Sequence, residues 1–275
     1  MRKIAGGISG AGLGLRYSFV GDAVSDPDKP LWFEIAPENW MGRGGFFRRS
    51  LERIRSEREI VCHGLSLSIG SPDPLNIEFL KDLKEFLDYF EISLYSEHIS
   101  LCSLNGSYIY DLLPLPMTEG MVKHISTRVH RVQEILERPL ILENISYYGV
   151  PFSTMKEPEF INSILSESGA YLLLDVNNVY VNSLNHNYDP YSFIDELDLS
   201  KVAYIHIAGH ERFERVIIDT HGAPVKKEVL RLLDYTIAKV GDVPVLLERD
   251  NNIPPYRELK EELRIIEGMI HGTRV

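Results

Sequence analysis

Short apolar runs alternate along this chain with longer stretches in which apolar residues recur every three or four positions. The short runs are rich in Val, Ile, Leu and aromatic residues, as is typical of parallel strands that are covered on both faces. They predict strands at 12–17, 31–36, 60–64, 93–98, 139–144, 170–176, 201–207 and 243–248. The longer stretches predict amphipathic helices at 76–90, 118–137, 226–240 and 255–270.

The order of these elements predicts the fold class. Strands that alternate with helices in this number indicate an α/β protein with a (βα)8 TIM barrel. The length of 275 residues is typical of one such barrel, and no long linker, low-complexity segment or break in composition divides the chain. We therefore expect a single TIM-barrel domain over residues 1–275.

Ionisable side chains stand at the ends of most predicted strands. They are His63, His98, Glu143, Asp175, His206 and Glu248, and the loops after 207 add His210, Asp219 and His221. An unpaired charge is costly to bury, and in TIM barrels the carboxyl ends of the strands form the functional face. The pattern predicts that these groups converge at that face, and that a metal cluster there neutralises their charge.

Each of these residues has a simpler interpretation when taken alone. His63 and His98 can be histidines that cap βα turns, and Asn177 and Asn178 suit Asx turns as well as they suit metal ligation. Asp219 and His221 share one face if residues 219–221 are extended. His186 lies in a predicted loop, and the sequence leaves open whether it reaches the site. His124, His130 and His271 are expected at the surface or packed against other residues.

The ligand types restrict the choice of metal. Five histidines and four carboxylates exceed the three or four protein ligands of one transition-metal site, so they suit two or three ions. A mixture of imidazole and carboxylate favours iron, manganese or zinc over magnesium or calcium, and the sequence does not separate these three metals.

Composition excludes some classes of protein. The formal net charge of −11 argues against a nucleic-acid partner, because such proteins neutralise phosphates with Lys and Arg. No apolar stretch approaches the roughly 20 residues of a transmembrane helix, and the start, MRKIAGGISGAG, lacks the apolar region of a secretory signal. Cys62 and Cys102 offer no disulfide framework. We expect a cytoplasmic protein that has no membrane partner.

The same residues lie in segments that resemble a known family. GLGLR, WFEIAPENW, VCHGLSLSIGS, YSEHIS, DLLPLP, LLLDVNNVYVN, IHIAGH and IDTH occur in the order of the UPF0276-type TIM barrels, from about residue 12 to about residue 255. This family is that of the multinuclear non-haem iron oxidative enzymes. In its compact length the chain is closest to the members of the type that acts in methanobactin biosynthesis.

The resemblance implies an oxidase or oxygenase with two or three irons, as mixed Fe(II)/Fe(III), and with O2 as co-substrate. Its substrate would be a cysteine-containing, ribosomally made precursor peptide. The products would be an oxazolone and thioamide, or others of related Cβ chemistry. A small partner protein would bind the leader peptide. It assigns metal binding to His63, His98, Glu143, Asp175, Asn178, His206, Asp219, His221 and Glu248. His210, Glu38 and Asn39 would be catalytic, with Ser66 beside the site, and His210 can alternatively be a ligand.

Two segments depart from the family pattern. The chain reads LENIS where many members have LENPS, and LLERD where many have IEWD, which leaves the ligands in place and puts the identity of the peptide in doubt.

Two rival functions remain open at this stage. A xylose-isomerase-like isomerase or hydrolase, or an endonuclease barrel, would share the fold but would hold redox-inert divalent metal and take up no oxygen. A metal carrier would bind ions without turnover, although it does not need nine ligands at a barrel mouth. In the plainest alternative the polar residues only cap loops.

Overall fold

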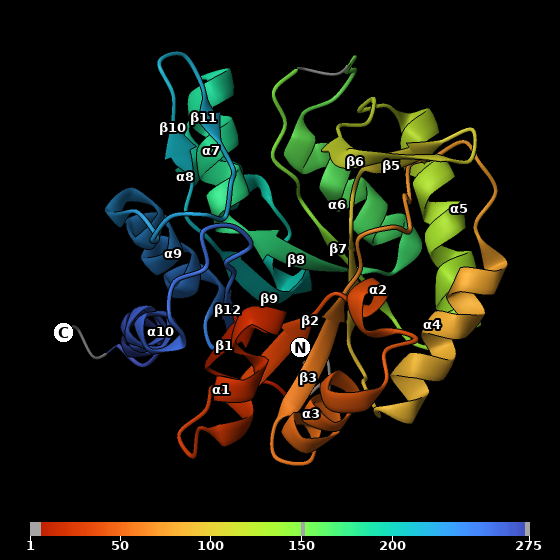
Figure 1. The fold of residues 1–275 in the computed structure, drawn as a ribbon. Coiled ribbons are helices and arrows are strands. Elements are labelled where there is room, and N and C mark those ends of the chain that lie inside the picture. Colours follow the sequence, from red (N-terminus) through yellow and green to blue (C-terminus); the bar gives the residue numbers. More distant parts are fainter. Residues whose placement is uncertain (1–6, 150–151, 273–275) are drawn as a thin grey trace.

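Eight parallel strands close into a barrel in the computed structural model, which describes residues 7–149 and 152–272 (Figure 1). The strands follow one another around the barrel in the order β1, β12, β9, β8, β7, β4, β3 and β2. Their bounds are β1 Ala11–Gly14, β2 Trp32–Ile35, β3 Glu59–His63, β4 Tyr95–His98, β7 Leu140–Glu143, β8 Tyr171–Asp175, β9 Val202–Ile207 and β12 Val245–Leu247. Every predicted strand is present, and the predicted (βα)8 TIM barrel is confirmed.

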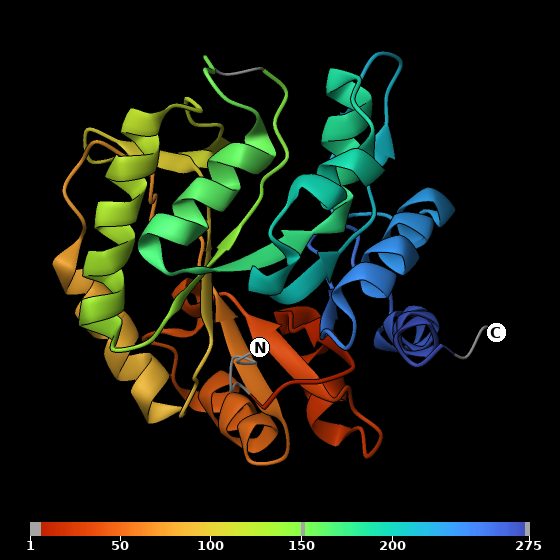
Figure 2. The ribbon, with the colours of Figure 1, turned by 180° about the vertical axis from the view of Figure 1, so that it is seen from behind.

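Helices surround the barrel and cover the outer face of its strands (Figures 1 and 2). They are α1 Val20–Ser25, α2 Pro37–Trp40, α3 Gly45–Arg55, α4 Ile77–Tyr89, α5 Glu119–Leu136, α6 Glu157–Ser168, α7 Val176–His186, α8 Pro190–Glu196, α9 Lys227–Val240 and α10 Tyr256–Ile270, with short 3-10 turns at Tyr17–Phe19 and Leu199–Lys201. Thr118 caps α5 by accepting a hydrogen bond from Met121 N, so the predicted start of that helix is confirmed.

The inside of the barrel is filled by an apolar layer. Successive side chains of a strand point to opposite faces, so every second residue faces inward. The inward layer consists of Trp32, Val61, Leu94, Ile141, Leu173, Tyr204 and Leu246. Leu94 directly precedes β4, and each of the others lies in a different strand. This layer separates the amino end of the barrel from the carboxyl end, which we call the mouth.

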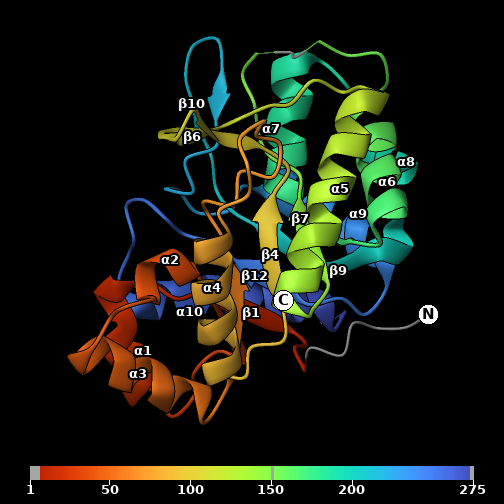
Figure 3. The same cartoon turned by 90° about the vertical axis from the view of Figure 1, so that its right-hand side faces the viewer.

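Two antiparallel hairpins that the strand pattern did not predict lie above the mouth. One pairs β5 (Leu101–Leu104) with β6 (Ser107–Leu113), and the other pairs β10 (Glu211–Arg212) with β11 (Ile217–Ile218). Figures 1 and 3 show both hairpins on the same side of the barrel as the upper end of α7. β10 and β11 have two residues each and are too short to stand out in the sequence, whereas β6 (SYIYDLL) is apolar enough to form a strand but is not needed to complete the eight strands of the predicted barrel.

In the described part of the chain, no helix combines the length and the apolar character needed to cross a bilayer. The prediction that the chain does not begin with a secretory signal falls partly on residues 1–6, which lie outside the described residues.

Candidate metal centre at the barrel mouth

The polar side chains predicted at the strand ends converge in the structure, because they follow the inward apolar layer by two positions. Val61 is followed by His63, Ile141 by Glu143, Leu173 by Asp175, Tyr204 by His206 and Leu246 by Glu248. Two residues along a strand return to the same face, so each of these groups points inward one step closer to the mouth. The strand register also sets His98 beside Glu143 and Asp175 beside His206.

The first group of donor atoms is formed by β3, β4 and β7. His63 Nε2 lies 3.0 Å from Glu143 Oε2 and 3.1 Å from His98 Nε2, and His98 Nε2 lies 3.1 Å from the same oxygen. Donors at right angles around an ion with bonds of about 2.1 Å are about 3.0 Å apart, which is √2 times the bond length. The three atoms are therefore close enough together to be ligands of one metal ion.

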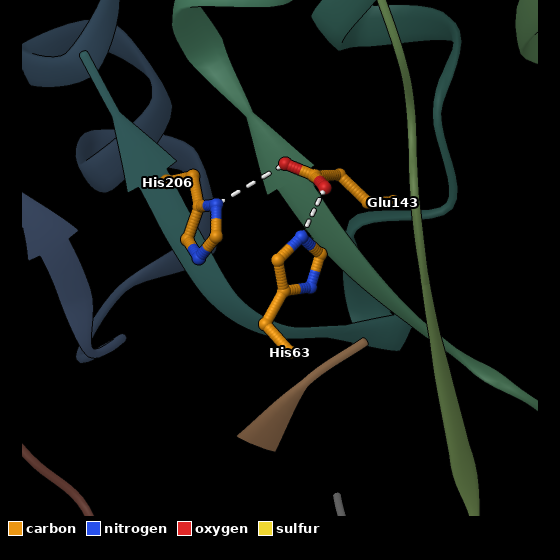
Figure 4. A group of neighbouring side chains, drawn as sticks. All are labelled: His63, Glu143 and His206. Atoms are coloured by element: carbon orange, nitrogen blue, oxygen red, sulfur yellow. Dashed lines mark hydrogen bonds and ion pairs between the residues drawn. The ribbon is translucent and has the colours of Figure 1, made fainter. Parts of the chain in front are cut away.

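The second group surrounds His206, which is fully buried. Its Nδ1 lies 3.1 Å from Glu143 Oε1 and 3.2 Å from Glu248 Oε2. Figure 4 shows Glu143 between His63 and His206, with one carboxylate oxygen directed at each ring. Because the two oxygens of Glu143 face different groups of donors, this carboxylate is placed to bridge two cations.

The third group lies nearer the loops. His221 Nε2 is 2.8 Å from Asp219 Oδ1, and His221 Nδ1 is 3.4 Å from Glu248 Oε2. The condition for Asp219 and His221 to share one strand face, an extended segment, is not met, because the segment turns at His221, whose φ is +47°. The two side chains meet across that turn rather than on one face of a strand.

Asp175 and Asn178 complete the third group. Asp175 caps α7, with Oδ1 accepting a hydrogen bond from Asn178 N at 2.6 Å, and Asn178 Nδ2 donates to Asn144 O at 3.0 Å. These bonds leave Asp175 Oδ2 and Asn178 Oδ1 buried, with no hydrogen-bond partner among the described residues. Asn178 therefore has a carbonyl oxygen available for a cation, and it makes no Asx turn.

Charge in the site is balanced by unusual protonation in the metal-free protein. Burial lowers the pKa of His63, but Glu143 outweighs it and raises this pKa to about 9. Burial would raise the pKa of Glu143, yet His63, His206 and His98 hold it far below its ordinary range. Burial, together with the negative charge of Glu143, raises the pKa of Asp175 well above its ordinary value.

The donor set fits bound cations. Besides the two oxygens above, Glu143 Oε2 and His221 Nε2 are buried and have ion-pair contacts but no well-oriented hydrogen bond within the described residues. Buried polar atoms are almost always paired, so the unpaired oxygens of Asp175 and Asn178 need a partner. Imidazole nitrogens with carboxylate and amide oxygens are the ligands of iron, manganese or zinc, and such cations would also compensate the clustered negative charge.

Some residues beside the mouth hold its loops in place and do not line the cavity. His210 was predicted as a ligand or a catalytic group, but it does not line the cavity: its Nδ1 is 2.9 Å from Asn177 Oδ1, and Asn177 Nδ2 donates to Asp219 Oδ1 at 2.7 Å. A Cβ on Gly209 would lie 1.9 Å from the carbonyl oxygen of Ala223, so this close approach of two loops requires glycine. His210 thus holds the loop that carries Asp219.

His186 contacts Tyr147 and does not reach the site. Its Nε2 lies 2.8 Å from the Tyr147 carbonyl oxygen and its ring stacks on Tyr147, away from the donor groups.

Glu38 and Ser66, predicted beside the site, are joined at its rim. Glu38 Oε1 accepts hydrogen bonds from Leu65 N, Ser66 N and Ser66 Oγ, whereas Glu38 Oε2 is buried without one among the described residues. Burial and the negative charge of Glu97 raise the pKa of Glu38. Asn39 is exposed and contacts Tyr17 through its backbone carbonyl.

Three functional candidates escaped the sequence analysis. Glu34, on β2, has an oxygen 3.0 Å from His206 Nε2. Arg16 Nη2 lies 3.2 Å from Glu248 Oε1 and also pairs with Asp250, whose Oδ2 is 3.0 Å from His221 Nδ1. For Glu34 the signal was present, because it is a carboxylate inside the apolar run LWFEIA. For Arg16 and Asp250, the contacts depend on how β1 and β12 pair.

A cavity of about 530 Å³ opens above the donor groups. Its floor is formed by candidate ligands, including His63, Glu143 and His221, and its walls by Leu65, Tyr108, Ile109, Leu112 and Tyr148. This size and mainly apolar lining are typical of sites that enclose a small ligand or a short segment of a larger one.

The chain is similar to proteins of known sequence over nearly its whole length. A UPF0276 protein of Shewanella sediminis is 50% identical over 264 residues, covering 95% of each chain. A UPF0276 protein of Acinetobacter baylyi is 47% identical over 261 residues, covering 94% of this chain and 91% of the relative.

Solved structures with little sequence identity share the fold. Endonuclease IV from Thermus thermophilus superposes with a TM-score of 0.62 at 17% identity, covering 96% of this chain and 99% of that one. D-Psicose 3-epimerase from Clostridium cellulolyticum superposes with a TM-score of 0.59 at 11% identity, covering 96% and 98%. The model of a family described as RiPP precursor modification enzymes, MbnB/TglH/ChrH, matches residues 10–271, and the chain belongs to this family.

Proposed function

We propose that this enzyme holds two or three iron ions at the mouth of the barrel and uses O2 to oxidise a cysteine of a precursor peptide. The family supports an enzyme that modifies ribosomally made precursors. The observation that carries the metal part is the mutual spacing of 3.0–3.1 Å among His63 Nε2, His98 Nε2 and Glu143 Oε2.

The residues present divide into neighbouring metal sites. His63, His98 and one oxygen of Glu143 would hold one ion, and the other oxygen of Glu143 would hold a second ion together with His206 and Glu248. Asp219, His221, Asn178 and Asp175 would serve a third. Bound iron would supply a site for a soft thiolate ligand and electrons for O2.

The surrounding groups of the chain position these ligands. Glu248 Oε1 is 3.2 Å from Arg16, which leaves Oε2 to face the donor groups. Glu38 lies at the rim with one buried oxygen free, and burial raises its pKa, so it is a candidate to accept a proton from the substrate. Asn39 is exposed beside it and is a candidate peptide contact.

The cavity matches a short peptide segment better than a whole precursor. About 530 Å³ accommodates a cysteine and its neighbours, and the walls offer aromatic and aliphatic contacts. Among the described residues that line the cavity are several carboxylates and neither Lys nor Arg. We infer that the segment next to the cysteine is neutral or basic, because an acidic one would be repelled.

The remainder of the precursor needs another binding surface. Residues 1–275 form one domain in our proposal, and its βα units are used to build the barrel, so a small partner protein would bind the leader. Cys62 and Cys102 are free thiols, which fits a reducing compartment, and we propose the cytoplasm.

Oxygen uptake tests the proposal. Protein loaded with Fe(II) without oxygen is mixed with a cysteine-containing candidate precursor, the partner protein and air-saturated buffer. The expected result is O2 consumption with a matching mass change in the peptide, and neither with a Cys→Ser peptide. Iron-loaded protein that consumes no O2 with any cysteine-containing precursor tested, but isomerises or hydrolyses a small molecule, would refute it.

A further inference from the structure

A chain of buried hydrogen bonds runs beneath the donor groups and starts at Glu34. Both oxygens of Glu34 lie close to His206 Nε2, Oε1 at 3.0 Å and Oε2 at 3.1 Å, and Oε2 also accepts a hydrogen bond from the Tyr204 hydroxyl at 2.8 Å. Tyr204 Oη lies 2.7 Å from Ser96 Oγ, and Ser96 Oγ lies 2.8 Å from His63 Nδ1. All five side chains are almost entirely buried, with exposures of 0–5%.

The direction of each hydrogen bond follows from the carboxylate. An ionised carboxylate only accepts, so the single hydroxyl proton of Tyr204 is directed to Glu34. Tyr204 Oη can then only accept from Ser96, whose single proton is therefore directed at Tyr204 and not at the more distant carbonyl oxygen of Cys62, 3.3 Å away. Ser96 Oγ can accept but not donate toward His63, so His63 keeps a proton on Nδ1, and Nε2, which faces His98 and Glu143, is the nitrogen that gives up its proton to bind metal.

The same carboxylate fixes the second ring. His206 donates from Nε2 to Glu34, so Nδ1, which is directed at Glu143 and Glu248, is the nitrogen that gives up its proton to bind metal. The ring nitrogen that binds a metal is set by the hydrogen bond that the other nitrogen makes. One buried charge therefore determines the tautomer of both histidines, one of them through two intervening hydroxyl groups.

We propose that Glu34 is a positioning residue, which through His206 directly and through Tyr204 and Ser96 indirectly keeps both rings ready to bind metal. This inference rests on the proposed function, since it concerns the same metal centre. A carboxylate that accepts from a ligating imidazole orients the ring and raises its basicity, and the loss of such a partner typically weakens metal binding about 10–100-fold. Glu34 also lies close enough to His206 and Glu248 to be a ligand itself, which the experiment must distinguish.

Metal affinity separates these roles. Chelator-treated protein is titrated with Co(II) under argon against a competing chelator, and bound metal is counted by elemental analysis. Glu34→Gln should bind Co(II) about 10–100-fold more weakly than wild type and with the same final stoichiometry. Tyr204→Phe and Ser96→Ala should weaken binding less, because each leaves the Glu34–His206 contact in place.

Glu157→Gln is the matched control. Glu157 is also a glutamate that accepts from a tyrosine hydroxyl, Tyr147 at 2.9 Å, but it is only half-buried and lies outside the metal centre, so its variant should bind Co(II) like wild type. Thermal unfolding curves identify any variant that loses affinity only because it is unfolded.

Nitrogen NMR of histidine-labelled, Zn(II)-loaded protein provides a second readout that a purely structural role would not change. We expect His63 to bind metal through Nε2 and His206 through Nδ1, with the opposite nitrogen of each ring protonated. In Ser96→Ala the signal of His63 Nδ1–H should shift or broaden while that of His206 is retained.

The outcomes are distinguishable. Wild-type affinity in Glu34→Gln, or binding of His206 through Nε2, would overturn the inference while the proposed metal centre stands. Loss of one ion with unchanged affinity for the others would make Glu34 a ligand and overturn its positioning role. Failure of the wild-type protein to bind Co(II) would overturn the proposed metal centre and this inference with it.

Discussion

A half-buried carboxyl group outside the metal centre gives a quantitative test of the structure. Glu157, in the first turn of α6, accepts a hydrogen bond from Tyr147, which belongs to the loop that follows the candidate ligand Glu143. Burial raises the pKa of Glu157 from its ordinary value of 4.5 to about 7. Replacing Glu157 by Gln removes the ionisation but keeps an oxygen that can accept from Tyr147.

The sign and size of the effect follow from proton linkage. The folded-state pKa is raised, so the stability contributed by protonated Glu157 is fully present below pH 4.5 and is lost as pH rises through 7. Each pKa unit corresponds to about 1.4 kcal/mol. The raised pKa therefore costs the folded state about 3 kcal/mol at pH 8, where Glu157 is ionised in both states, and about 1.4 kcal/mol at pH 5.5, where folding takes up a proton. Glu157→Gln should therefore be more stable than wild type, by roughly 2 kcal/mol more at pH 8 than at pH 5.5.

Urea unfolding at the two pH values measures this difference. Glu159→Gln is the control, since Glu159 is exposed in the same first turn and experiences a similar helix dipole. It should change stability little and equally at both pH values. If Glu157→Gln gains nothing at pH 8 relative to pH 5.5, or only as much as the control, the environment assigned to Glu157 is wrong.

Three further outcomes follow from the placement of side chains at the mouth. Glu143→Ala and His98→Ala should each lose metal and turnover together, because Glu143 faces two donor groups and His98 completes one. A folded variant that keeps its full iron content by elemental analysis would contradict this. His186→Ala should keep its metal content, since its ring contacts Tyr147 rather than the cavity. Glu38→Gln should keep the metal and reduce turnover by about 100-fold or more. Full activity in this variant would argue against Glu38 as a base.

The fold was predictable because the strands of this barrel are short and nearly uniformly apolar. That pattern arises only where both faces are covered, and here helices cover the outside while the layer from Trp32 to Leu246 fills the inside. The hairpins β5–β6 and β10–β11 were missed: Glu211–Arg212 is too short to show a strand pattern, and Ser107–Leu113, although largely apolar, falls outside the alternation of strands and helices that predicted the barrel.

The candidate site could be predicted where it depends on single strands. Alternation along a strand places His63 inward and Cys62 outward, so the convergence of strand-end groups is a property of local sequence. The roles of loop residues depend on contacts between segments far apart in the chain. His210 was expected at the centre, but its partner, Asn177, is set by the packing of two loops. Glu34 was overlooked because it precedes the end of its run by two residues.

The most direct test of the central claim is the identity and number of the metals in protein purified without oxygen, by elemental analysis. We predict two or three irons per chain, falling sharply in Glu143→Ala. Zinc, magnesium or manganese with negligible iron, persisting after anaerobic supplementation with Fe(II), would contradict an iron-dependent oxidation at this barrel mouth and favour a redox-inert isomerase or hydrolase.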